Sequence, residues 1–475
     1  MGGADKNTAL RELLDEAEIS NTGLAAAIVA AAAREGLHLG TSTTTIRRML
    51  DGSQPQWPTP RLVAAVLAGR LQREVTLTEC GFLDRSPPQE DPYDGLRCSG
   101  TLDGALRTIV ELTGRDMRRR KLLLGSAFSV AAFAEPTLYA LTVPPAQGTA
   151  RAAGPRIGLA DVQVLTEQVT YLHKLSAEYG SGRVRTQLVQ LLHGEGNRLL
   201  HSTYTEKTGK ALLSTVANAT LHAGWMTGDV GRHALAQRYL IQALDLALRA
   251  GDRHLAAEIL CGAGGLTARI GENAPPGQDT TRHGRQAVAL ARAGLTIAQD
   301  TVHPALAAAL HGAEAKGFSL LGDARETRHA ALAAQRCYET VTPEDAASVY
   351  VVNAYGQDLG NSLLRIGDTE QALTLSTMAL DGAEPWMARG RCVNQVLLAR
   401  THLQGRDLEQ AAACGRDALR NAATLSSTIV TDRLRALQRQ VAPLRAASPY
   451  LANLDDRITE HLLRSARDHR NDTTL

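Results

Sequence analysis

A short run of threonines and arginines near the amino terminus carries the clearest chemical capability in this 475-residue chain. It reads TSTTTIRRMLDG, from Thr41 to Gly52. Thr41 or Ser42 can cap a helix, and glycine at position 52 suits the left-handed residue that follows a helix. At 100° per residue, the side expected to face a core carries Ile46, Leu50, Met49, Thr43 and Ser42.

The opposite side of this predicted helix is polar. It carries Thr41, Thr44, Thr45, Arg47, Arg48 and Asp51. Hydroxyl and guanidinium groups donate hydrogen bonds to phosphates and to guanine edges in a major groove. We therefore expect Thr44, Thr45, Arg47 and Arg48 to lie at a double-stranded DNA operator, with Thr41 and Arg61 nearer the phosphates.

The local charge distribution favours the same interpretation. Between Thr41 and Arg73 the sequence has five arginines and a single acid, Asp51, whereas residues 5–18 are rich in acids. A short capped helix after another helix is typical of a helix-turn-helix. The connection from Arg34 to Gly40 is long for such a turn, so a small docking domain with a solvated Thr/Arg face remains the alternative.

Catalytic motifs are weak throughout the sequence. The glycines of GAGGLTARIG (262–271) follow no predicted strand, so small residues at a helix crossing explain them better than a dinucleotide site. Pairs such as His193/Glu195 and His311/Glu314 lack the further ligands of a metal site. We expect neither an enzyme nor a cofactor or metal.

The elements that must position these residues are helical repeats. From Leu359 to Leu380, small residues fall seven, five, four and three positions apart, at Gly360, Gly367, Ala372, Ser376 and Ala379. This spacing lets two antiparallel helices pack closely, with Gly367 and Asp368 at the turn. It resembles the tetratricopeptide repeat (TPR), a helix-turn-helix unit that buries its hydrophobic face only by stacking on neighbours.

Two further copies keep the same spacing. One comprises Gly224, Gly231, Ala236, Leu240 and Ala243, and the other Ala399, Arg406, Ala411, Gly415 and Ala418. A weaker unit lies around residues 318–334. An alanine-rich bundle is the alternative, but three matches at one spacing favour an all-α chain ending in a TPR-like helical solenoid.

A solenoid of this kind predicts a concave binding groove lined by the first helix of each pair. The expected groove positions are Trp225, Gln357, Asn361, Arg365 and Arg400. Asparagine and arginine there can hold a carboxylate or a peptide backbone by charge-assisted hydrogen bonds. Equally, these side chains can merely solvate the groove or satisfy helix ends.

Composition and linkers divide the chain into three regions. We expect a helix-turn-helix domain over 1–85, a linker with a basic and apolar helix over 86–158, and the repeat domain over 159–475. The linker contains a basic cluster, 118–121, and an apolar run, 122–134, that is too short to span a membrane. The run predicts a helix buried against the solenoid, and the role of the basic cluster stays open.

Bulk composition agrees with an all-helical, cytoplasmic protein. Aromatic residues make up only 4% of the chain, and 51 basic residues nearly balance 49 acidic ones. Any interaction with nucleic acid must therefore depend on a local patch. The six cysteines are scattered, as in a reduced compartment, and no stable membrane insertion is expected.

Several segments together resemble a known family. They are TIRRMLDGSQP, VTLTECGF, RRRKLLLGSAFSVAAFAEP, HAGWMTGDVGRHALAQRYLIQAL and SPYLANLDDRI. The chain resembles actinomycete transcriptional regulators that join an XRE-like helix-turn-helix to a TPR-like region, a group that includes negative regulators of sporulation and antibiotic production. It departs from them at Met49, where an aromatic residue is commoner, and at Thr227, where a tyrosine is commoner.

The resemblance implies regulation of development or secondary metabolism. We expect a DNA-binding homodimer whose groove takes a peptide, a small molecule or a protein as effector. The alternative is a protein-interaction scaffold that does not bind DNA.

Overall fold

The computed structural model of the protein describes residues 6–34, 39–83, 95–117, 127–142, 148–152, 154–275, 277–299, 302–342 and 349–472. In these segments the regular structure is helical, as predicted, and the only β pairing is two isolated bridges, Arg151 with Tyr204 and Arg156 with Thr203. The contacts divide the chain into two compact units, Met1–Pro92 and Tyr93–Leu475.

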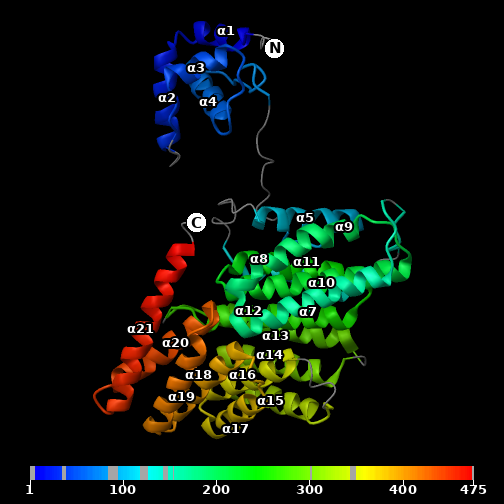
Figure 1. Ribbon diagram of the computed structural model, residues 1–475, viewed down its shortest axis with the longest axis vertical. Helices are drawn as coiled ribbons and strands as arrows, with labels where there is room; N and C mark the ends of the chain where they lie inside the picture. Colours follow the sequence, from blue (N-terminus) through cyan, green and yellow to red (C-terminus); the bar gives the residue numbers. More distant parts are fainter. Residues whose placement is uncertain are drawn as a thin grey trace. The chain divides into compact units, whose positions relative to one another are not determined.

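The first unit is a four-helix domain (Figure 1). Its helices are α1 (Thr8–Glu16), α2 (Asn21–Arg34), α3 (Thr43–Leu50) and α4 (Thr59–Leu71). They bury a common core that includes Leu10, Ile28, Ile46 and Leu67. The Asn7 side chain joins the two ends of the unit, because it caps α1 by accepting from the Leu10 amide at 2.9 Å and donates to the Cys80 carbonyl at 2.9 Å.

The second unit is built mostly of long helices. In chain order they are α5 (Leu102–Met117), α6 (Ala134–Thr142), α7 (Leu159–Tyr179), α8 (Ser181–Leu191), α9 (Asn197–Leu200), α10 (Glu206–Asp229), α11 (His233–Ala250), α12 (Arg253–Glu272), α13 (Thr281–Ala298), α14 (Pro304–Leu321), α15 (Ala324–Tyr338), α16 (Val349–Arg365), α17 (Thr369–Asp381), α18 (Ala388–Gln404), α19 (Leu408–Ala422), α20 (Thr428–Val441) and α21 (Pro449–Asp472). Short 3-10 or π turns occupy Val130–Phe133, Leu192–Gly196 and Ala442–Leu444.

From α10 to α19 consecutive helices pack as antiparallel pairs, and the pairs stack on one another in a solenoid-like array (Figure 1). The predicted spacing of small residues explains the clearest pair, α16 and α17. A Cβ atom at Gly360 would lie 2.9 Å from the Ser376 hydroxyl, Gly367 makes the turn at φ +84°, and Ala372 is fully buried. Close approach of the two backbones therefore depends on these residues.

The other two copies have the same geometry. Gly231 makes the turn between α10 and α11 at φ +80°, and a Cβ at Gly224 would lie 3.2 Å from Leu240. Between α18 and α19 the turn residue is Arg406, which takes φ +63° although it is not glycine. The turn residue therefore has a positive φ in all three copies. At Arg406 this is a backbone conformation that L residues disfavour.

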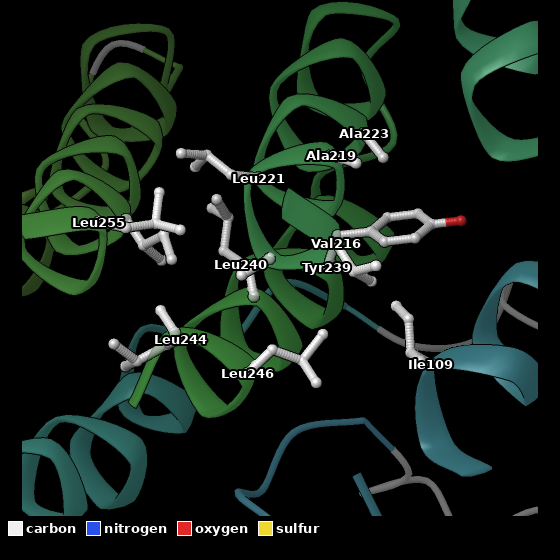
Figure 2. Close-up of a cluster of buried hydrophobic side chains, with 14 of the residues drawn as sticks. Ile109, Val216, Ala219, Leu221, Ala223, Tyr239, Leu240, Leu244, Leu246 and Leu255 are labelled. Carbon is white, nitrogen blue, oxygen red and sulfur yellow. The ribbon is translucent and has the colours of Figure 1, made fainter. Parts of the chain in front are cut away.

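The largest core lies where α5, α10, α11 and α12 meet. Figure 2 shows Ile109 of α5 facing the Tyr239 ring of α11, with Val216 of α10 beside it. The Tyr239 hydroxyl donates to the buried Asp116 carboxylate at 2.7 Å, and Asp116 also pairs with Arg185. A polar network thus anchors α5 to this core.

This packing bears on the segment 86–158, which the sequence suggested as a linker. Its described parts contribute Leu106 and Phe133 to the core of the second unit, so they pack as part of that unit. Of the segment expected to be helical over 122–134, residues 127–129 are not helical and Val130–Phe133 form a 3-10 turn before α6, whereas residues 118–126 with the basic cluster lie outside the described residues. Among the described helices, none is long and apolar enough to cross a membrane.

Late helices of the second unit return to its early ones. The Gly182 amide donates to the Ser426 carbonyl at 2.9 Å, and the Ser426 amide donates to the Tyr179 carbonyl at 3.1 Å. Helix α18 also packs against α7. The stacked pairs therefore curve until the region before α20 meets the α7–α8 junction, and the first helices of the pairs line the inner side of the curve.

Candidate functional site

The threonine- and arginine-bearing helix α3 begins with a reciprocal cap. The Ser42 hydroxyl accepts from the Thr45 amide, and the Thr45 hydroxyl accepts from the Ser42 amide, both at 3.4 Å. The helix ends before Gly52, which has φ +91°. These two signals set the length of α3, as the sequence predicted.

The predicted faces of α3 agree with the structure in most positions. Ile46, Met49 and Leu50 are buried, whereas Thr44, Arg47 and Arg48 are exposed. Ser42 differs from the expectation of a core-side position, because a capping residue precedes the first helical turn and its side chain is exposed. Thr45 is half-buried with its hydroxyl engaged in the cap, so it is not a free donor like Thr44.

The exposed arginines of α3 differ in their surroundings from the other arginines of the predicted basic patch. Arg47 and Arg48 have no ion pair with any described residue, and Thr41 is half-exposed just before the helix. Arg61 is exposed on the first turn of α4. Arg73, in contrast, pairs with Glu16 at 2.9 Å and with Glu79 at 3.1 Å, so it adds little to the net positive charge.

The connection before α3 is longer than a helix-turn-helix turn. Helix α2 ends at Arg34 and α3 begins at Thr43, and α2 packs against both α3 and α4. The two helices are held near each other by packing and by contact of the Thr22 and Thr43 hydroxyls at 3.4 Å. The unit therefore holds α2 and α3 side by side, with more residues between them than a helix-turn-helix turn has.

The inner side of the second unit encloses a cavity of about 230 Å³ that includes Trp225, which we call the tryptophan cavity. Its small and apolar lining includes Gly224, Gly262, Gly265, Leu266, Val393 and Ile429. Its cationic lining consists of Arg269, Lys316, Arg389 and Arg433. Seven helices, α10, α11, α12, α14, α16, α18 and α20, contribute to the cavity, and α7 adds His173 and Ala177.

Two glycines of α12 shape this cavity in different ways. A Cβ atom at Gly262 would lie 2.5 Å from Trp225 Nε1, so glycine is needed for the indole to lie against the helix. A Cβ at Gly265 would meet no atom within 4 Å, because this position opens into the cavity. The glycine-rich run thus serves the helix crossing predicted from the sequence, and it also leaves space for the cavity.

A stack of rings lies beside the tryptophan cavity. The His173 and His222 rings are 4.1 Å apart, and the Trp225 ring meets His222 edge-on at 5.1 Å. Burial, with a smaller effect from Arg389, lowers the pKa of His173 to about 4. Burial likewise holds the pKa of His222 well below 6.5. Both rings are therefore neutral at pH 7 and present an aromatic rather than a charged wall.

A second cavity, of about 240 Å³, shares Arg433 with the first, and we call it the arginine cavity. Its charged lining consists of Glu272, Arg365, Arg400, Arg433 and Arg439. All five groove residues predicted from the sequence lie at these two cavities: Trp225 and Gln357 line the first, Arg365 and Arg400 line the second, and Asn361 connects Arg400 to Glu272.

The structure gives these polar groove residues an internal partner. The Asn361 amide donates to the Glu272 carboxylate at 2.7 Å, and Arg433 donates to it at 3.0 Å. Lys316 and Arg365 lie 3.9 and 4.0 Å from the same carboxylate. Asn361 and Arg365 therefore contact a carboxylate of the chain itself, Glu272.

Glu272 keeps its charge although it is buried. Burial disfavours the carboxylate, but the positive charges of Lys316 and Arg433 outweigh this and hold the pKa of Glu272 at about 2. Glu272 is the last residue of α12, where the helix dipole also disfavours an acid. In the same cluster, burial and then Arg433 lower the pKa of Arg400 to about 10.

Sequence reasoning missed the residues that complete the two cavities. These are Arg269, Glu272, Lys316, Arg389 and Arg433. Some of these residues lie on helices outside the three predicted repeat copies. The others lie at positions that are not among the small residues by which the repeats were recognised. A charged residue inside a run of small ones, as in GLTARIGE, is the one sequence signal that marks part of this set.

Other reactive groups are dispersed. Within the described segments, no three His, Cys, Asp or Glu side chains are arranged to hold a metal ion. The six cysteines are free, and burial raises the pKa of Cys80 to about 11 and that of Cys392 to about 12. These thiols are packed side chains rather than nucleophiles.

The first unit matches a known protein family. Residues 10–83 match the family described as the SP15 N-terminal domain. No curated protein matches the chain. The similarity covers α2, α3, α4 and most of α1, and none of the helices that form the two cavities.

Proposed function

We propose that this protein is a cytoplasmic DNA-binding transcriptional regulator of development or secondary metabolism. The observation that carries the proposal is the exposed face of α3, where Thr44, Arg47 and Arg48 project from a capped helix and the two arginines have no acidic partner among the described residues. Unpaired arginines on such a helix suit phosphates and guanine edges.

In this proposal Thr44, Arg47 and Arg48 contact the operator bases, and Thr41 and Arg61 contact the phosphates. Thr45 acts indirectly, since its hydroxyl holds the cap that orients the helix. The second unit, with its TPR-like pairs of helices, supports a homodimer. A twofold axis would then require paired half-sites about one helical turn apart, or a multiple of that spacing.

The cavities of the second unit supply the regulatory part of the proposal. An effector bound there would change how the late helices meet the early ones, and so the placement of the two DNA-reading helices in a dimer.

A binding assay with the full chain tests the proposal. DNA from the region upstream of the protein's own gene is titrated with wild type and with the Arg47→Ala/Arg48→Ala double variant, and fluorescence anisotropy reports binding. We expect tight, salt-sensitive binding by wild type and at least a tenfold loss of affinity in the variant, because two guanidinium groups no longer reach phosphates or bases. Equal affinities would rule out α3 as the reading helix.

One observation favours a second function, a scaffold that docks a protein on the first unit. The connection between Arg34 and Thr43 is longer than the turns of helix-turn-helix motifs. A scaffold would show no binding to any DNA fragment at low salt, with the first unit still folded by circular dichroism.

A further inference from the structure

The charge of the arginine cavity is out of balance. Four guanidinium groups line it, Arg365, Arg400, Arg433 and Arg439, against the single carboxylate of Glu272. Nearby acids are committed elsewhere, since Asp358 pairs with Lys316 at 2.9 Å and Asp432 pairs with Arg435 at 3.2 Å. Four positive charges around one cavity repel one another, so an added anion would be attracted.

Two arginines of this cluster can donate further hydrogen bonds to a ligand. The Nε of Arg400 is buried and donates no hydrogen bond, although its Nη1 donates to Asn361 at 2.9 Å. Arg439 is exposed on α20 and has no ion pair with any described residue. A buried donor without an acceptor is unfavourable, and an anionic group in the cavity can supply one.

The tryptophan cavity has the opposite character. Two of its four cations are compensated, because Arg389 pairs with Asp229 at 3.3 Å and Lys316 pairs with Asp358. Apart from its charged and polar groups, the wall is small or apolar, with Trp225, Leu266 and Ile429 and with the open position at Gly265. Such a surface suits a ring or an apolar body rather than a second charge.

We propose that the two cavities form one binding site for a small organic anion, with its apolar body against Trp225 and Leu266 and its carboxylate or phosphate group at Arg365, Arg400 and Arg439. Arg433 lines both cavities, so it lies where the apolar body of the ligand would join its acid group. This inference rests on the proposed role of the second unit as the effector-binding region, and it names the chemistry of the effector.

Cavity size sets the scale of the ligand. The tryptophan cavity alone, of about 230 Å³, lies just below the roughly 300–1,000 Å³ of sites for drug-sized molecules, and together with the arginine cavity of about 240 Å³ the site falls within that range. The tryptophan cavity corresponds to about seven or eight liquid waters at ~30 Å³ each. The contacts between Tyr179, Gly182 and Ser426 close the curve of helices on one side, which favours a compact molecule over an extended peptide.

The probe for this site is 2-naphthoate, with 2-naphthamide as its neutral counterpart and inorganic pyrophosphate as an anion without an apolar body. Binding to the full chain is measured by isothermal titration calorimetry in the absence of DNA. We expect naphthoate to bind at least tenfold more tightly than either comparison compound. Failure of naphthoate to bind at millimolar concentration, or equal binding of the amide or of pyrophosphate, would overturn the proposal.

Two variants locate the probe. Gly265→Leu fills the tryptophan cavity from a helical position that has open space, so the fold is retained while the affinity for naphthoate falls at least tenfold. Arg439→Gln removes a guanidinium that takes no part in the internal ion pairs, and about a fivefold loss is expected. Arg285→Gln, at an exposed position of α13 outside both cavities and without an ion pair among the described residues, is the control and keeps wild-type affinity.

The outcomes separate this inference from the proposed function. Naphthoate binding that is abolished in Gly265→Leu and weakened in Arg439→Gln supports the site even if the protein binds no DNA. If the protein binds DNA but neither variant changes naphthoate affinity, the proposed regulator function stands and the proposed anion site is wrong. Unchanged naphthoate affinity in both variants, with their folds intact by circular dichroism, contradicts the inference.

Discussion

Ser427 donates a hydrogen bond to the Asp229 carboxylate, although the two residues are 198 positions apart. Asp229 is 1% exposed and also receives Arg389 at 3.3 Å and the Ser181 amide at 3.3 Å. Burial opposes its charge, but Arg389 and these hydrogen bonds lower the pKa of Asp229. One carboxylate thus joins the start of the curved array to its end.

Asp229→Asn should therefore destabilise the second unit. The variant leaves Arg389 without its counter-charge and replaces an acceptor oxygen by an amide donor, so we expect a loss of about 2 kcal/mol. Asp407→Asn is the control, because Asp407 caps α19 at an exposed position and asparagine caps equally well. Urea denaturation followed by circular dichroism measures both. Equal stabilities of the two variants would mean that the closing contacts contribute nothing.

The turn at Arg406 gives a stabilising prediction. Its φ of +63° is disfavoured for an L residue, whereas Gly231 and Gly367 occupy the same turn position as glycines. Arg406→Gly should raise the free energy of unfolding by about 1 kcal/mol, and Gly367→Ala should lower it by about 1 kcal/mol. Thermal unfolding of both variants tests this. Destabilisation by Arg406→Gly would show that the arginine side chain contributes more than its backbone strain.

Glu272 predicts a specific pH dependence. Its pKa of about 2 in the fold lies below the ordinary value of 4.5, so its contribution to stability is complete above pH 4.5 and disappears as the pH falls toward 2. Wild type should exceed Glu272→Gln by on the order of 3 kcal/mol at pH 7, and the difference should shrink across that window. Urea unfolding at several pH values measures it.

An exposed acid provides the comparison for Glu272. Glu460 is 70% exposed and pairs with Arg464, so Glu460→Gln should change stability by less than about 0.5 kcal/mol at every pH. If wild type and Glu272→Gln lose stability in parallel between pH 4.5 and 2, the arginine cavity does not hold Glu272 ionised.

The local features of this fold were predictable from the sequence. The spacing of Gly360, Gly367 and Ala372 predicted how two helices approach and where the chain turns, because small residues and left-handed glycines act within one pair. The faces of α3 were also predictable from local sequence, because the apolar residues Ile46 and Leu50 lie on one side of the helix and are buried.

The partners of the groove residues were not predictable. Asn361 and Arg365 were predicted as groove residues, and their carboxylate partner in the structure is Glu272, some 90 residues earlier in the chain. The bond from Ser427 to Asp229 likewise depends on how several helix pairs curve in total. Repeat spacing fixes each pair and not the accumulated rotation between pairs, so contacts across the curve appear only in the folded structure.

The central claim is that α3 reads DNA, and the salt dependence of DNA binding tests it most directly. The proteins to compare are wild type, Arg47→Ala/Arg48→Ala and the control Arg11→Ala/Arg73→Ala. Both variants remove two positive charges, but the control removes Arg73, which its own acids already neutralise. We predict that the slope of log affinity against log salt decreases by about 0.9 for each phosphate that the α3 variant no longer neutralises, and is unchanged in the control. Identical slopes for all three proteins, or no DNA binding by wild type at low salt, would contradict the account.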